Sequence, residues 1–184
     1  MNETSATLLE RLRRPSDHDA WVMFVQLYTP LLYKWASQLG LQSAEAADLV
    51  QDVFVKLLRT LPEFEYDRQR SFRAWLSTLV RNHFRDAQRK LVPLTPGTGF
   101  DLAADDPIVE IAEVEYRTYL TERSLQLVQR EFSPPTWKAF WGVVVDGRPV
   151  AVVGKEQGLS PNAVYLARGR VLRRLREALR GLLD

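Results

Sequence analysis

The sequence has no cysteine, which excludes disulfide scaffolds, cysteine-ligated zinc, iron–sulfur clusters and cysteine nucleophiles. Histidine is scarce as well, and neither His18 nor His83 stands in a metal-ligating spacing such as H-E-x-x-H. No apolar run approaches the roughly 20 residues that a bilayer span needs. No apolar stretch follows a basic start, as it would in a secretory signal. These absences predict a cytoplasmic protein that is neither exported nor inserted in a membrane.

Catalytic motifs are equally scarce. Gly97 and Gly99 lack the third glycine, the strand and the helix start of a dinucleotide-binding loop, and no G-x-x-x-x-G-K-[ST] segment is present. Asp48 and Asp52, considered as an acid/base pair, have no identifiable partner in the sequence. We therefore expect a protein that is not an enzyme and that binds no cofactor and no metal.

What the chain does have is an uneven distribution of charge. The net charge is only +2, yet residues 67–90 carry seven basic and two acidic residues and residues 132–184 carry nine and four. Residues 91–131, between them, carry three basic and eight acidic residues. Two basic blocks separated by an acidic one predict two surfaces that face a polyanion. The alternative is that long helices simply carry solvated arginines.

Closely spaced prolines and glycines indicate where the chain divides into domains. Residues 92–99 contain two prolines and two glycines and are followed by three aspartates. We therefore predict a linker over residues 93–109, with one domain over 1–92 and another over 110–184. Apolar residues recur at helical spacing on both sides of this linker. The predicted fold is all-α, with two small helical domains joined by a flexible linker.

The first domain begins with an aromatic helix. Ser16 or Asp17 can cap a helix that runs through Trp35, that Pro30 bends or interrupts, and that Gly40 ends. Its aromatic side chains are most simply interpreted as part of the hydrophobic core.

A second helix is predicted over residues 44–61, after Ser43, with an apolar stripe on one face. Asp48 and Asp52 lie on a different face and repel each other across one turn by a few tenths of a kcal/mol. The two aspartates either bind a basic surface on a partner or form a solvated acidic face.

The helix predicted over residues 72–90 follows a polar connection at 62–71. Its arginines recur on a ridge of four-residue spacing, with Ser77 in the vacant step, and further polar residues lie nearby. The ridge comprises Arg73, Arg81, Arg85 and Arg89, and the neighbours are Arg70, Asn82 and Lys90. Like charges at this spacing are unfavourable without an anion, and a nucleic-acid backbone supplies phosphates at about this repeat. The other possibility is a solvated face that Asp86 and the acidic linker partly neutralise.

In the second domain we predict a helix over residues 108–132 and an aromatic helix capped by Thr136. Residues 143–153 are ambiguous, because valine runs on both sides of an Asp-Gly favour a β-hairpin. The residues after them favour a helix instead. Gly158 to Asn162 combine a turn, a capping serine and a proline at the first helical position, and they open a helix that runs to Leu183.

A short helix, a turn with glycine and a second helix are typical of a helix-turn-helix. Its outward residues at the start of the last helix are those that would enter a major groove. They comprise Asn162, Tyr165, Leu166, Gly169 and Arg170, and the capping Ser160 and Pro161 before them belong to the same candidate DNA-binding group. A cationic flank suited to phosphates follows, formed by Arg168, Arg170, Arg173, Arg174, Arg176 and Arg180. An αα-hairpin in a helical bundle can have the same pattern.

Taken together, three segments resemble the extracytoplasmic-function (ECF) sigma factors of bacterial RNA polymerase. They are residues 46–54 (AADLVQDVF), residues 72–86 (FRAWL followed by VRNHFRD) and the C-terminal helix-turn-helix. The resemblance covers nearly the whole chain. It implies a sigma domain 2, a flexible linker and a sigma domain 4 that direct core polymerase to promoters, melt the DNA and begin transcription. It also removes the hairpin interpretation of 143–153.

The resemblance implies partners for each group of residues. The segment that docks on the clamp helices of the polymerase beta-prime subunit matches Asp48, Gln51, Asp52 and Phe54. The segment that binds the minus-ten element matches Arg70, Arg73, Arg81, Asn82, Arg85 and Arg89, and the helix-turn-helix residues above match the reader of the minus-thirty-five element. The beta subunit is a further expected partner. The resemblance leaves room for an anti-sigma factor, of which the sequence carries no sign.

The chain departs from the family pattern in the first helix of the helix-turn-helix. Val152, Val153 and Gly154 stand where an acidic, an aliphatic and an alanine residue are usual, and Gln157 replaces a usual leucine. Glycine inside a helix costs about 1 kcal/mol relative to alanine. Two other classes of function fit parts of the sequence: a dimeric helix-turn-helix regulator that does not bind polymerase, and a protein-binding helical adaptor.

Overall fold

The computed structural model describes residues 7–63, 71–91 and 113–183. Every regular element within these ranges is helical, which confirms the all-α prediction. The elements are α1 (Leu8–Leu12), α2 (His18–Gln38), α3 (Ser43–Thr60), the 3₁₀ helix η1 (Leu61–Glu63), α4 (Phe72–Leu91), α5 (Glu113–Gln129), α6 (Pro134–Val144), α7 (Val150–Gln157) and α8 (Pro161–Leu179). None of these helices is long and apolar enough to cross a membrane. The predicted linker at 93–109 and the helix start at Ile108 lie outside the described residues.

Helix α2 begins where the sequence indicated. Asp17 is its N-cap and accepts a hydrogen bond from the backbone N–H of Ala20 at 3.1 Å. The Arg11 guanidinium donates two hydrogen bonds to the same carboxylate, at 2.9 and 2.7 Å, and holds the pKa of Asp17 down to about 2. The helix then runs unbroken through Pro30, and Gly40 takes a positive φ of 84° just after its end.

Three predicted helix ends were wrong in detail. The aromatic helix α6 is capped at Ser133 rather than Thr136, because prolines are well tolerated in a first helical turn, where N–H groups have no helical partner. Helix α5 ends at Gln129, before Phe132. Helix α8 ends at Leu179 rather than Leu183, because Arg180 is extended and Gly181 adopts a φ of 82°.

The hairpin alternative for residues 143–153 is wrong. Helix α6 ends at Val144, α7 begins at Val150, and the Asp-Gly dipeptide turns between two helices, with Gly147 at a φ of 66°. Val153 is buried in a small cluster with Ala139 and Val164. Of the valines that suggested strands, Val153 therefore packs from a helix against α6 and α8, while Val144, Val145 and Val152 stay exposed, and an isolated hairpin is marginal in water.

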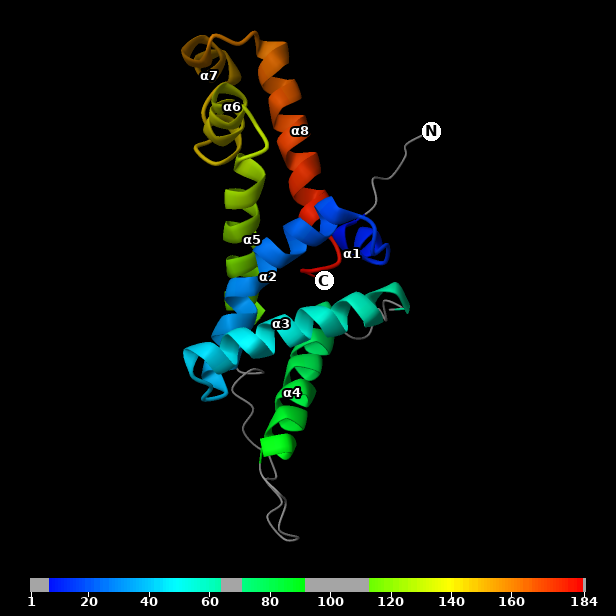
Figure 1. Cartoon of the computed structure of the whole chain (residues 1–184). Coiled ribbons are helices and arrows are strands. Elements are labelled where there is room, and N and C mark those ends of the chain that lie inside the picture. Colours follow the sequence, from blue (N-terminus) through cyan, green and yellow to red (C-terminus); the bar gives the residue numbers. More distant parts are fainter. Residues whose placement is uncertain (1–6, 64–70, 92–112, 184) are drawn as a thin grey trace.

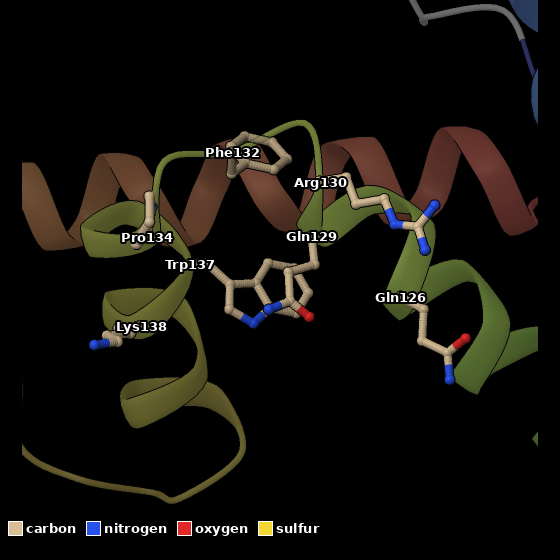
Figure 2. Close-up of a pocket in the computed structure, with 7 residues that line it drawn as sticks. All are labelled: Gln126, Gln129, Arg130, Phe132, Pro134, Trp137 and Lys138. Atoms are coloured by element: carbon tan, nitrogen blue, oxygen red, sulfur yellow. The ribbon is translucent and has the colours of Figure 1, made fainter.

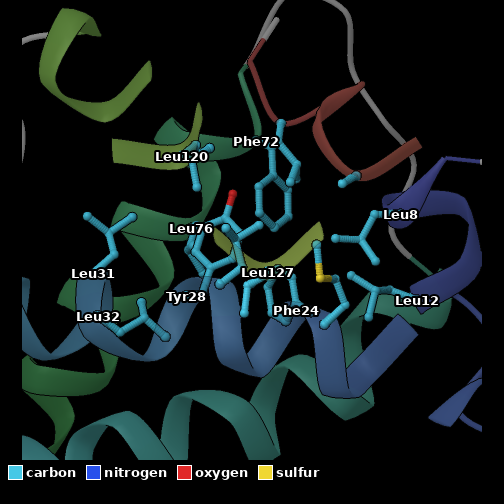
Figure 3. Packing of buried hydrophobic residues seen from close by; sticks show 14 of the residues in the cluster. Leu8, Leu12, Phe24, Tyr28, Leu31, Leu32, Phe72, Leu76, Leu120 and Leu127 are labelled. Carbon is cyan, nitrogen blue, oxygen red and sulfur yellow. The ribbon is translucent and has the colours of Figure 1, made fainter. Parts of the chain in front are cut away.

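The main hydrophobic core extends across both halves of the chain. Figure 1 shows α3 and α4 at one end of the molecule and α6 and α7 at the other, with α2 lying between them beside α5. In Figure 3, Phe24 and Tyr28 of α2 meet Phe72 of α4 and Leu120 of α5. All four side chains are fully buried. The two helical halves are thus packed against each other in this structure.

The turn of the helix-turn-helix depends on a close approach at Gly154. A Cβ atom at this position would lie 2.7 Å from the carbonyl oxygen of Leu159. The backbone N–H of Leu159 in turn donates to the carbonyl of Gly154 at 2.8 Å. Gly158 ends α7 in the left-handed conformation, with a φ of 65°. The glycine that seemed to weaken α7 is therefore what lets the turn fold back on it.

We expect Gly154→Ala to destabilise the protein, although alanine is the better helix former. Overpacking against a backbone atom costs about 1–3 kcal/mol, which corresponds to a fall of several degrees in the midpoint of thermal unfolding. Gly169→Ala in α8 is the matched control, because no atom lies within 4 Å of its added Cβ, and it should raise the midpoint. A Gly154→Ala protein that unfolds at or above the wild-type temperature would contradict the close-approach argument.

Candidate nucleic-acid interface

The acidic face of α3 lies opposite its buried stripe. Asp48, Gln51 and Asp52 are exposed, and the Asp52 side chain retains 66% of its accessible surface. The stripe on the other side is formed by Ala46, Leu49, Val50, Val53 and Leu57. The three polar residues therefore have no part in the core and are available to a partner.

Phe54, the fourth residue of this predicted group, is positioned differently. Its ring packs edge-on against Phe24, with centroids 6.1 Å apart, and the side chain is only partly buried. Phe54 therefore links the acidic helix to the core, and only its remaining exposed part can contact a partner.

One contact on this face was missed by sequence reasoning. The Nε2 of His83, on α4, lies 3.4 Å from Oδ2 of Asp52. The two residues are far apart in the sequence, so no local pattern could have paired them. Their contact joins the acidic face of α3 to the basic helix α4.

The arginine ridge of α4 does not form one continuous exposed face. Ser77, in the vacant step, is buried, and its hydroxyl donates to the carbonyl of Ala74 at 3.0 Å. Arg73 and Arg81 are half-buried, and the Arg73 guanidinium lies over the ring of Tyr116, 5.6 Å from its centroid. The first part of the ridge thus faces the protein.

The exposed part of α4 lies nearer its C-terminal end. Asn82 is exposed and Arg85 is partly exposed. Arg70 and the side chain of Arg89, which belong to the same predicted group, lie outside the described residues. Within the described part, Asn82 is the exposed member of the group, and Arg85 is as partly buried as Arg73 and Arg81 but lies nearer the C-terminal end of α4.

The helix-turn-helix has the expected geometry. The Ser160 hydroxyl accepts from the backbone N–H of Ala163 at 3.2 Å, and Pro161 occupies the first position of α8. Asn162 is exposed, and Tyr165 and Leu166 expose 55% and 51% of their surface. Two large apolar side chains at the open start of a helix have no packing role, so they are free to touch base edges.

The basic flank of α8 is partly neutralised. Arg174 donates two hydrogen bonds to the Glu131 carboxylate, at 2.6 and 2.7 Å, and therefore ties α8 to the loop after α5. Arg173 lies 4.0 Å from Glu177 on the same helix. Arg170 is exposed, as are the other described flank residues Arg168, Arg176 and Arg180. The flank available to phosphates is thus smaller than the sequence suggested.

A hydrogen bond from Arg148 to Glu156 fastens the loop before α7 to that helix. The bond lowers the pKa of Glu156 and raises that of Arg148, so both groups remain charged at neutral pH. It helps to hold α7 in place relative to α6.

The structure also has a pocket of about 500 Å³ where α5 turns into α6 (Figure 2). Its lining comprises Gln126, Gln129, Arg130, Phe132, Pro134, Trp137 and Lys138. None of the residues predicted to contact polymerase or DNA lines it. Among the residues that the structure describes, no cluster of histidine and acidic side chains could hold a metal ion.

Comparison with known proteins agrees with this geometry. Residues 24–92, which contain most of α2 and all of α3 and α4, match the sigma-70 region 2 family. Over 181 residues the chain is 25% identical to the ECF RNA polymerase sigma factor BldN of Streptomyces coelicolor. The alignment covers 95% of this chain and 67% of that protein.

Proposed function

We propose how this chain engages its partners as a sigma factor. Its match to sigma-70 region 2 and its similarity along almost its whole length to an ECF sigma factor support an ECF-type sigma factor of transcription initiation. Core RNA polymerase binds the acidic face of α3 through the beta-prime clamp helices. Helix α4 holds the minus-ten element as the DNA melts, and α7 and α8 read the minus-thirty-five element.

One observation carries the polymerase part of this proposal. Within the segment matched to region 2, Asp48, Gln51 and Asp52 face solvent directly opposite a fully apolar stripe. Two aspartates one turn apart repel each other and do not stabilise the helix. A basic surface on a partner would convert that repulsion into attraction. The beta subunit and an anti-sigma factor stay expectations of the family resemblance.

The DNA part is supported by two separate sets of side chains that are exposed or, for Arg85, partly exposed. Asn82 and Arg85 on α4 combine a hydrogen-bonding amide with a cation, which suits an unpaired strand. Asn162, Tyr165 and Leu166 on α8 offer one amide and two apolar contacts to base edges. Leu166 suits the methyl group of thymine, the apolar feature of the major groove.

We predict that Asp52→Arg weakens binding to core polymerase by at least about tenfold, because it replaces an attractive charge at an interface with a repulsive one. The affinity can be measured by titrating labelled protein with core enzyme, with helix content followed by circular dichroism. Asp146→Arg is the matched control, since it makes the same charge change at an exposed position in the loop before α7. Equal core affinity for wild type and Asp52→Arg would remove α3 from the interface.

The contact of α4 with the displaced strand is tested by its salt dependence. Arg85→Ala should reduce the slope of log affinity against log salt by about 0.7 for a holoenzyme bound to single-stranded non-template DNA, if the guanidinium meets one phosphate. Lys34→Ala on α2 removes an exposed cation outside the predicted interface and should leave the slope unchanged. An unaltered slope in Arg85→Ala would mean that this arginine is only solvated.

Sequence choice should reside in the first turns of α8. In the presence of polymerase, Asn162→Ala or Tyr165→Ala should change selection at the upstream promoter element by about 1–3 kcal/mol for each lost base contact. Arg170→Ala should instead weaken all promoters similarly. Selection from a randomised promoter library measures both. Tight binding of the free protein to palindromic DNA, with two chains per duplex, would favour a dimeric regulator instead.

A further inference from the structure

Among the residues that the structure describes, Gly169 is the one glycine for which the fold supplies no reason. Four others take a positive φ, at which a side chain is strained, namely Gly40, Gly147, Gly158 and Gly181. Gly142 and Gly154 lie against other parts of the fold, where an added Cβ would come within 3.1 and 2.7 Å of another atom. Gly169 has no positive φ, and no described atom lies within 4 Å of the Cβ that it lacks. Packing alone would therefore accept a larger residue here.

Gly169 also weakens the helix that contains it. It lies in the middle of α8, far from the caps at either end. Glycine is less favourable inside a helix than every residue except proline, because it loses the most backbone freedom on folding. No contact within the described part of the chain offsets this loss. A glycine at such a position is expected where a partner approaches the backbone more closely than a Cβ atom would allow.

The position of Gly169 on α8 indicates which partner this is. Seven residues make about two helical turns, so Gly169 lies in line with Asn162, on the side opposite the buried stripe. Tyr165 and Leu166, each more than half exposed, stand one turn before it, and their side chains leave its Cα uncovered. Gly169 is thus a gap in the middle of the face proposed to enter the major groove.

The surroundings of this gap are cationic. Arg168 and Arg170 flank Gly169, Arg173 lies one turn further on, and all three are exposed. Helix α8 has no acidic side chain before Glu177. Such a surface is complementary to a phosphate backbone rather than to a basic protein surface. Figure 1 shows that α8 starts beside α7, at the end of the molecule away from α3 and α4.

We propose that Gly169 is the point of closest approach between α8 and promoter DNA. The duplex packs against the bare backbone at this residue. This contact sets how deep α8 lies in the major groove, and hence how far Tyr165 and Leu166 reach toward the base edges. The inference rests on the proposed function, in which α8 reads the minus-thirty-five element.

Gly169→Ala distinguishes this role from a structural one, because the thermal midpoint should rise while promoter recognition is lost. The probe is a labelled promoter fragment that wild-type holoenzyme selects from a randomised library. The same fragment with a scrambled upstream element serves as the reference, so the ratio of the two affinities reports on the α8 contact. We expect Gly169→Ala to lower this ratio at least about fivefold, the lower end of what one lost base contact costs. Gly169→Leu, with a larger side chain, should lower it further.

Thr118→Ala on α5 is the matched control. Alanine is a better helix former than threonine at this exposed position, so the midpoint should rise here as well. The affinity ratio should stay at its wild-type value, because α5 is outside the proposed DNA contact. A Gly169→Ala protein with a higher midpoint and an unchanged ratio would overturn the close approach. A fall in both quantities would also contradict it, because the glycine would then serve the fold.

A double-mutant cycle tests the link to base recognition. If the added methyl group lifts α8 out of the groove, Tyr165→Ala should reduce the affinity ratio less in the Gly169→Ala background than in the wild type. Equal reductions in the two backgrounds would refute the idea that Gly169 sets the reach of Tyr165.

The same cycle separates this inference from the function on which it rests. If neither Tyr165→Ala nor Arg170→Ala affects promoter binding, α8 does not read DNA and both proposals fail. If those two variants lose binding while Gly169→Ala retains it, α8 still reads DNA and only the close approach at Gly169 is rejected.

Discussion

The aromatic contact between Phe24, Tyr28 and Phe72 is what the arrangement of the helices depends on. The ring centroids of Phe24 and Tyr28 lie 4.5 Å apart, and Phe72 meets each ring edge-on at about 6 Å. Through these rings α2 holds α4, and the hydroxyl of Tyr28 reaches α5. Because three helices share one buried cluster, a change in any of them is felt by the surfaces that the others present.

That shared core sets how the polar surfaces are presented. Helix α3 places its apolar stripe inward, and Asp48 and Asp52 therefore point outward, where Asp52 also meets His83 of α4. Helix α4 buries its first turns beside α2, and its exposed polar residues are accordingly found further along. Each of these helices thus uses one face, or one part of its length, for packing and leaves the other exposed for a partner.

The C-terminal helices follow a different constraint, the tight turn before α8. Gly154 and Gly158 provide a close approach and a left-handed residue, so that Ser160 can cap the next helix. The departure from the family pattern at Gly154 is compatible with a rigid helix-turn-helix, because the missing methyl group leaves room for the Leu159 carbonyl. The exposed pair Tyr165 and Leu166 then lies at the start of a well-anchored helix.

The sequence by itself determined the longer helices, the caps at Asp17 and Ser160 and the outward residues of α3 and α8, because these follow from local spacing, turn residues and capping groups. Only the tertiary structure decided which partners those residues meet. The contact of His83 with Asp52, the pairing of Arg174 with Glu131 and the position of Arg73 over Tyr116 all join residues distant in the chain. Residues 143–153 show the same limit, since valine runs favour strands locally, whereas in the structure Val153 packs from a helix against α6 and α8. Local propensity is decided within a few residues, whereas packing depends on surfaces that meet only when the chain has folded.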